Sequence, residues 1–315
     1  MRHYELTEET IDWRGCTLHR IKALIDLPQH GVKEGDLGGF VESYDNLSDN
    51  AWVGEEAKVY ENAKVFENAR VLGDARVLGN AEVFGSALVC GSALVCGSAK
   101  VYVNAKVFGN AVVCRNARVY DNVQVFENAR VLGDADVRGN AKVYVNAKVF
   151  GDAVVCGDAK VCGAAEVYGD ARVFGDAEVF ESAKVFGYAK VYDNTEVYGN
   201  AKVYGYAEVC GNARVFDNAK VYENARVSGA AVVCGNATIK STDDYMVFKN
   251  CWSSGRYFTW TRSNNMWRVG CFYGTGEEII AKAYEDSELS GKCYETIVRS
   301  TEAINTYIND AKGTK

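Results

Sequence analysis

The chain of 315 residues is 48% apolar and carries a net charge of -7. This composition supports a continuous core, and the mild negative charge argues against general binding to nucleic acids. Residues 1–50 contain no apolar leader segment, and no stretch of the chain approaches 18 apolar residues. We therefore expect a cytoplasmic protein without a membrane span.

Residues 1–50 are expected to form an N-terminal cap, because a stacked repeat must close its open strand edge. The run 18–25 predicts a strand, and a turn is expected from Pro28 to Gly35. Gly38-Gly39 is interpreted as a tight turn and not as a phosphate cradle, since neither a P-loop nor a GxGxxG pattern surrounds it.

Residues 51–242 consist of 32 units of six residues without an insertion or deletion. In a typical unit, Ala63-Lys-Val-Phe-Glu-Asn68, Ala and Val occupy positions one and three, and charged and aromatic residues occupy positions two and four. This alternation is typical of a half-buried strand, and the last two positions, often Gly-Asn or Gly-Asp, predict a turn. Each unit is therefore expected to form one strand and one corner.

The small inward residues favour an all-β solenoid of triangular section, with three units or about 18 residues in each coil. Neighbouring coils would pair in parallel about 4.8 Å apart, which gives a rod roughly 50 Å long. Units such as Val203-Tyr-Gly-Tyr-Ala207-Glu resemble the hexapeptide repeat of left-handed parallel β-helices. The resemblance implies the left-handed sense, and a right-handed or two-sided solenoid is the alternative.

Most of the eleven cysteines replace the aromatic residue at position four of a unit. No CxxC pair or histidine-rich spacing is present, so we expect free thiols, no metal site and no cofactor. The seven cysteines at position four are Cys90, Cys96, Cys114, Cys156, Cys162, Cys210 and Cys234.

The residues at position four should form one outward ladder on each face of the prism. One ladder runs from Phe66 through Phe84 and Tyr102 to Tyr120 and stops at Arg138, and another is broken by Cys90, Cys162 and Cys234. The most continuous ladder is a hypothetical self-association face, together with two tyrosines that replace corner residues beside it. Its members are Phe150, Tyr168, Phe186, Tyr204 and Tyr222, with Tyr188 and Tyr206 at the corner.

The aromatic ladder has two alternative roles besides self-association. Stacked rings stabilise a parallel ladder by themselves, without any partner. Aromatic residues beside a column of lysines are also able to stack on nucleic-acid bases or sugars, which the negative net charge disfavours for nucleic acid. Blocks of the repeat recur at shifts of 42 and 60 residues, which are whole units but not whole coils. Duplicated blocks would lie on different faces, so the rod is interpreted as a spacer with recognition at its ends.

Residues 243–315 abandon the period and predict a separate α+β module. Short strands are expected at 245–248, 257–261 and 266–269, with a hairpin turn at 263–265. Thr275-Gly-Glu-Glu278 is a capping box for one helix, and a second helix is expected after Gly291.

Three tryptophans and three arginines lie close together in this module. Because such side chains carry most of the energy of interfaces, they predict a binding surface for a protein partner. The alternative is that a module of about 70 residues needs its tryptophans for a core. The candidate residues are Trp252, Arg256, Trp260, Arg262, Trp267 and Arg268.

Gly35-Asp-Leu-Gly-Gly39 and Val269-Gly-Cys-Phe-Tyr-Gly-Thr275 resemble segments of hexapeptide-repeat proteins of bacteria and their phages, often catalogued as transferases. The resemblance to acyltransferases of this fold implies a histidine base at a cleft between subunits. However, His3, His19 and His30 all lie before the repeat, and we assign no catalytic residue. We expect a non-enzymatic scaffold that presents its C-terminal module to a macromolecular partner, and an acyl or nucleotidyl transferase is the alternative.

Overall fold

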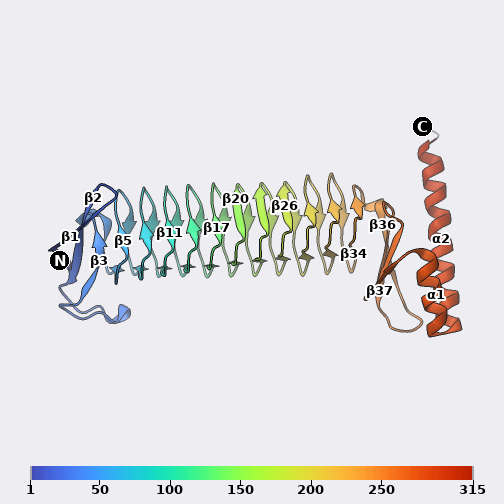
Figure 1. Cartoon of the computed structure of the whole chain (residues 1–315), viewed down its shortest axis with the longest axis horizontal. Coiled ribbons are helices and arrows are strands. Elements are labelled where there is room, and N and C mark those ends of the chain that lie inside the picture. Colours follow the sequence, from blue (N-terminus) through green and yellow to red (C-terminus); the bar gives the residue numbers. More distant parts are fainter. Residues whose placement is uncertain (1, 314–315) are drawn as a thin grey trace.

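The computed structural model describes residues 2–313, which form a straight rod with a cap at one end and an α+β module at the other (Figure 1). Each hexapeptide contributes one short strand, and every third strand pairs in parallel with the next coil. Leu88 pairs with Lys106 and Val89 with Val107, for example, a register shift of one coil of three units. The parallel solenoid of three-unit coils is thus confirmed.

The three faces of the rod are three parallel sheets, in each of which the rod strands follow one another along its axis. The first face contains β5 (Lys58–Val59), β8 (Arg76–Val77), β11 (Leu94–Val95), β14 (Val112–Val113), β17 (Arg130–Val131), β20 (Lys148–Gly151), β23 (Glu166–Gly169), β26 (Lys184–Gly187), β29 (Lys202–Val203), β32 (Lys220–Val221) and β35 (Thr238–Ile239). The second face contains β6 (Lys64–Val65), β9 (Glu82–Val83), β12 (Lys100–Val101), β15 (Arg118–Val119), β18 (Asp136–Val137), β21 (Val154–Val155), β24 (Arg172–Val173), β27 (Lys190–Val191), β30 (Glu208–Val209) and β33 (Arg226–Val227). The third face contains β4 (Trp52–Val53), β7 (Arg70–Val71), β10 (Leu88–Val89), β13 (Lys106–Val107), β16 (Gln124–Val125), β19 (Lys142–Val143), β22 (Lys160–Val161), β25 (Glu178–Val179), β28 (Glu196–Val197), β31 (Arg214–Val215) and β34 (Val232–Val233).

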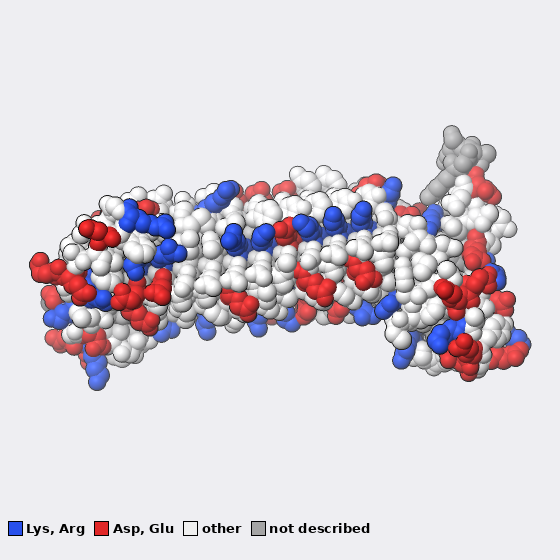
Figure 2. Space-filling view, in the orientation of Figure 1, with Lys and Arg blue, Asp and Glu red and all other residues white. Residues whose placement is uncertain are grey.

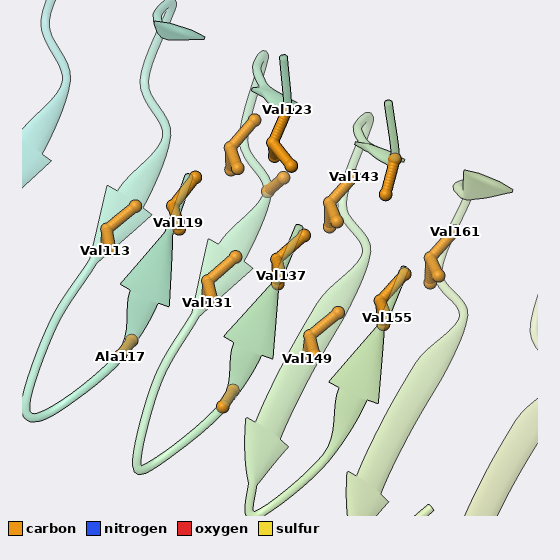
Figure 3. Packing of buried hydrophobic residues seen from close by; sticks show 14 of the residues in the cluster. Val113, Ala117, Val119, Val123, Val131, Val137, Val143, Val149, Val155 and Val161 are labelled. Atoms are coloured by element: carbon orange, nitrogen blue, oxygen red, sulfur yellow. The ribbon is translucent and has the colours of Figure 1, made fainter. Parts of the chain in front are cut away.

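The interior of the rod is a continuous stack of valine and alanine side chains. Figure 3 shows Val131 and Val149 from one sheet and Val137 and Val155 from the next pointing into the shared interior, and all four are fully buried. Ala171 and the other alanines at position one are equally buried. Small side chains at position one let the chain turn each corner without leaving a void, which explains the narrow residue choice.

The corners depend on the fifth position of the unit, where the backbone takes a positive φ in every unit except the last. Gly187 (φ 69°) shows why glycine is common there, since a Cβ would lie 3.1 Å from the amide nitrogen of Gly205 in the next coil. Val103 and Val145 also take this conformation, each with φ 63°. The pairing continues through the corners, because the amide of Tyr188 donates to the carbonyl of Gly205 at 2.8 Å.

The N-terminal cap extends the first face of the rod. Strands β1 (Tyr4–Trp13) and β2 (Cys16–Ala23) form an antiparallel hairpin, and β3 (Leu37–Val41) joins β2 to the parallel strand β5. The 3-10 turns Pro28–His30 and Tyr44–Asn46 follow β2 and β3. The sequence predicts the second strand but not the first. Parallel pairing therefore already begins within residues 1–50.

The glycine pair of the cap lies within strand β3, so the expected tight turn is wrong, and the pair is a packing site. A Cβ at Gly38 would lie 2.5 Å from both a side-chain carbon of Ile21 and the carbonyl oxygen of Val53. At Gly39 it would lie 2.5 Å from the carbonyl oxygen of Ala57. These glycines allow β3 to approach the first coil closely, which is a structural role.

The C-terminal module follows the turn Thr242–Asp244. It contains the antiparallel strands β36 (Tyr245–Lys249), β37 (Tyr257–Thr261), β38 (Met266–Val269) and β39 (Phe272–Gly274), then α1 (Gly276–Asp286) and α2 (Glu288–Gly313). The capping box is confirmed, because Thr275 accepts from the amide of Glu278 and Glu278 accepts from that of Thr275. The second helix begins at Glu288, before Gly291, and β39 was not expected. Neither described helix is long and apolar enough to cross a membrane.

The small sheet lies between the end of the rod and the two helices (Figure 1). Alternate residues of β36 face opposite ways: Tyr245 and Val247 pack against the rod core, whereas Met246 and Phe248 pack against the module core. Both faces of this sheet are therefore covered, and the module also closes the last coil.

Candidate partner-binding site

The predicted surface of tryptophans is wrong for Trp260 and Trp267. Both are buried, at 0% and 1% exposure, and they pack with Phe258 under the helices. The indole nitrogen of Trp260 donates to the side chain of Asn265 at 2.8 Å. Because the sheet is covered on both sides, these two tryptophans form core and do not reach a partner.

Trp252 lies at the edge of this core, in the loop between β36 and β37. Its ring meets that of Tyr294 of α2 edge to face, with the centroids 5.1 Å apart. Its indole nitrogen is buried and has no hydrogen-bond partner within the described part of the chain. Trp252 is half-buried, so part of the ring stays accessible beside α2.

The three arginines have different environments, and charge alone does not keep them all at the surface. Arg268 is half-buried at the junction, with its guanidinium over the ring of Phe216 of the rod at 5.4 Å. Arg262 is half-buried as well, and its Nε and Nη2 are buried without a partner among residues 2–313. Only Arg256 is exposed.

Arg256 lines a cavity of about 230 Å³ between the β36–β37 loop and the helices. Asn250 holds this loop in place: its side chain accepts from the amide of Ser253 and donates to the hydroxyl of Tyr294 at 3.2 Å. Burial raises the pKa of Tyr294, so the hydroxyl stays protonated. The lining comprises Asn250, Ser253, Ser254, Arg256, Val269, Phe272, Ile279, Lys282, Ala283, Asp286, Ser290 and Tyr294.

The cavity carries both signs of charge on an apolar floor. Arg256 comes from the loop, and Lys282 and Asp286 come from α1, where residues four apart lie on one side of the helix. Sequence reasoning found Arg256 and missed Lys282 and Asp286. Their spacing in the predicted helix was visible, but the loop that faces them was not.

The predicted self-association face forms one regular ladder. Its rings stack almost in parallel, with centroids 4.8 or 4.9 Å apart along the series. Each ring is half-buried. The members in order are Phe150, Tyr168, Phe186, Tyr204 and Tyr222.

The other two faces carry stacked rings too. Phe66 and Phe84 stack at 4.8 Å on the second face, and Phe108 and Phe126 stack at 4.9 Å on the third. Stacking is therefore a general property of this rod and stabilises its ladders without a partner.

The corner tyrosines distinguish the first face. Tyr188 and Tyr206 are 53% and 63% exposed, and they stack on one another. Beside the ladder runs a row of basic side chains with one acidic interruption, visible along the rod in Figure 2. The interruption is Glu166, whose carboxylate lies 2.7 Å from Lys184 and 3.1 Å from Lys148. The hydrogen bond from Lys184 lowers the pKa of Glu166, and Lys148 adds to the effect.

The three histidines all contact backbone carbonyls of the cap region. His3 lies 2.8 Å from the carbonyl oxygen of Ala51, and His30 lies 2.6 Å from that of Asn50. Burial lowers the pKa of both imidazoles. His19 contacts the carbonyl of Thr7 at 3.4 Å. Within residues 2–313 no cluster of three metal-ligating side chains occurs.

A family model described as "YdcK Beta solenoid repeat" matches residues 219–235, about one coil of the rod. No curated protein matches the chain. The match and the parallel coils agree on the architecture, and the chain is a β-solenoid repeat protein.

Proposed function

We propose that this protein is a non-enzymatic scaffold whose rod holds the C-terminal module at a fixed distance from the cap and presents it to a protein partner. The module binds through the cavity lined by Arg256, Lys282 and Asp286. The observation that carries this proposal is the one exposed arginine of the predicted set, at the rim of a preformed cavity. A cytoplasmic location remains our expectation.

Rigid attachment of the module supports the scaffold role. The amide of Val232 donates to the hydroxyl of Thr259 at 2.9 Å, and the amide of Thr238 donates to that of Ser263 at 2.6 Å. The hydroxyl of Tyr245 donates to the carbonyl of Arg226 at 3.0 Å. These bonds pair two amides and one carbonyl of the rod that the next coil would otherwise satisfy, so the module replaces a coil and does not hang on a linker.

The experiment is affinity capture from lysate with the full chain and with Arg256→Glu. The variant should lose the captured partner and keep its circular dichroism spectrum, because Arg256 is exposed and the core is untouched. Lys106→Glu makes the same charge change at an exposed position on the third face of the rod and should retain the partner. Capture by Arg256→Glu at wild-type yield would refute a role for this cavity.

Self-association is a second candidate function, favoured by the exposed pair Tyr188 and Tyr206. Two large apolar side chains more than half exposed at one corner give the first face a contact that the other ladders lack. Association through this corner would place two or more modules on one particle without occupying the cavity at Arg256.

A further inference from the structure

The aromatic ladder on the second face contains a gap. Its rings stack from Phe66 to Tyr120, with the last step, Tyr102 to Tyr120, at 4.7 Å. The ladder resumes with Phe174 and Tyr192 at 4.8 Å. Arg138 and Cys156 occupy the two positions between.

The guanidinium of Arg138 is held toward Tyr120, the last ring before the gap, and not toward Cys156. Its Nη1 donates to the hydroxyl of Tyr120 at 3.3 Å and to the carboxylate of Asp136 at 3.1 Å. Asp136 is 4% exposed and also pairs with Arg118 at 2.9 Å. One buried carboxylate thus fixes two arginines, and the position of Cys156 stays uncovered.

A cavity of about 610 Å³ lies at this position. Arg138 and Phe174 are two coils apart, which is about 9.6 Å at the spacing of parallel strands. A flat ring at the level of Cys156 would therefore lie one ladder step from each of them, within the normal range for stacked groups. The lining comprises Arg118, Asp134, Asp136, Arg138, Asp152, Val154, Cys156, Arg172 and Phe174.

A similar gap on the third face shows why this one is open. There Cys162 lies between the rings of Tyr144 and Phe180, but Lys160 and Glu178 form an ion pair of 2.6 Å beside it. The hydroxyl of Tyr144 also hydrogen-bonds to the thiol of Cys162, which raises the pKa of Tyr144 to about 12.

Beside Cys156 the corresponding pair of residues is Val154 and Arg172, which cannot form such a bridge. Val154 is short and apolar, and it lines the cavity. Arg172 is exposed and, within the described chain, has no ion pair. The gap at Cys156 is therefore accessible from solvent.

We propose that this gap binds a small planar aromatic ligand that carries an acidic and a basic group, as a free aromatic amino acid does. The ring fills the missing ladder step between Arg138 and Phe174. The acidic group pairs with Arg172, and the basic group faces Asp134 and Asp152 at the corner. Positions two and four of a unit are about 6.6 Å apart along the strand, which a short side arm spans. This site lies on the rod and is independent of the C-terminal module.

The test is a ligand-detected NMR titration of the full chain with L-phenylalanine. Saturation transfer to the ring protons is expected for the wild type and should be lost in Cys156→Phe, because the new ring occupies the gap. Cys156→Phe should keep or raise the thermal midpoint, since it completes a ladder. Cys162→Phe is the matched control and should still bind. No transfer to the wild type at millimolar ligand, or full transfer to folded Cys156→Phe, would overturn the proposal.

Two further variants separate the parts of the site. Val154→Lys with Arg172→Glu copies the bridge found beside Cys162 and should close the cavity and abolish binding. Arg172→Gln should raise the Kd for L-phenylalanine about tenfold, by loss of a charge-assisted pair. Phenethylamine lacks the carboxylate and should bind Arg172→Gln and wild type equally. Equal binding of L-cyclohexylalanine and L-phenylalanine would contradict the stacked ring.

Discussion

The guanidinium of Arg268 lies over the ring of Phe216, and this contact joins the C-terminal module to the last aromatic residue of the third face. Arg268→Glu should loosen the docking, because a cation over a ring contributes about 1 kcal/mol. We expect roughly five-fold faster hydrogen exchange at the amides of Val232 and Thr238, which donate across the junction. Arg256→Glu is the control and should leave both rates unchanged. Unaltered exchange in Arg268→Glu would show that the contact does not hold the module.

The self-association face is tested by Tyr188→Ser with Tyr206→Ser. Both side chains are exposed, so the double variant should fold normally and show a lower mass in light scattering. Phe186→Ser with Tyr204→Ser should have the same effect, with some loss of stability from the broken ladder. Phe84→Ser with Tyr102→Ser changes a ladder on the second face and should leave the mass unchanged. If the wild type is a monomer and neither first-face variant loses a partner, the rings have only a structural role.

The rod core should be sensitive to volume in both directions. Ala171→Leu places a larger side chain at a fully buried corner and should destabilise the rod by about 1–3 kcal/mol. Val173→Ala leaves a cavity between neighbouring valines and should cost about 1–3 kcal/mol as well. Chemical denaturation followed by circular dichroism measures both. Unchanged midpoints would contradict the inward assignment of the two columns.

Val103 takes a left-handed backbone conformation that a β-branched residue adopts only at a cost. Val103→Gly should therefore raise the free energy of unfolding by about 1 kcal/mol, although glycine increases the entropy of the unfolded chain. Val112→Gly is the matched control, since Val112 lies in strand β14 with an ordinary backbone. Val112→Gly should destabilise the rod. If both variants increased the free energy of unfolding, strain at Val103 would be ruled out as the cause.

Glu166 should contribute to stability in a pH-dependent way. Its lowered pKa means that the contribution is complete above the pKa of the unfolded chain, about 4.3, and is lost as pH falls through the folded value. Glu166→Gln should thus lower the midpoint of denaturation at pH 7 and have progressively less effect as the pH falls through the lowered pKa of Glu166. The difference at neutral pH should be about 1 kcal/mol or less for a pair near the surface. Glu196→Gln, on the third face, provides the control. A difference in midpoint between Glu166→Gln and the wild type that grows toward low pH would contradict the stabilising role of the Glu166 carboxylate.

The sequence was sufficient to predict the rod, because the residues of each unit specify both its strand and its corner. Ala63 and Val65 point inward, Glu67 sits at a corner with positive φ, and the next unit repeats the pattern. No distant contact alters these local choices, so period and fold agree. The strand Tyr4–Trp13 was missed, because most of it is only partly buried and its exposure does not alternate.

The candidate site was only partly predictable, because its residues depend on how separate elements dock. Trp260 and Trp267 have the composition of an interface, but the sheet that carries them is covered by both the rod and the helices. Arg256 was found because it lies close in sequence to the tryptophans, and the structure leaves it exposed in the loop before β37. Lys282 lies far along the chain, and nothing in the sequence indicated that the β36–β37 loop would face it.

The unbroken coil of three hexapeptides fixes the direction in which the C-terminal module points. Removing a full coil would shorten the rod by about 4.8 Å and leave the module facing the same way relative to the cap. Removing a single hexapeptide would turn the module by about a third of a revolution, because the last strand would then end on a different sheet. A duplication of 42 or 60 residues adds a number of whole coils plus one further hexapeptide. Either duplication would therefore have lengthened the rod and also turned its distal end. Selection on the angle between the two ends would therefore act on the number of hexapeptides, and this angle changes without any substitution in the module itself.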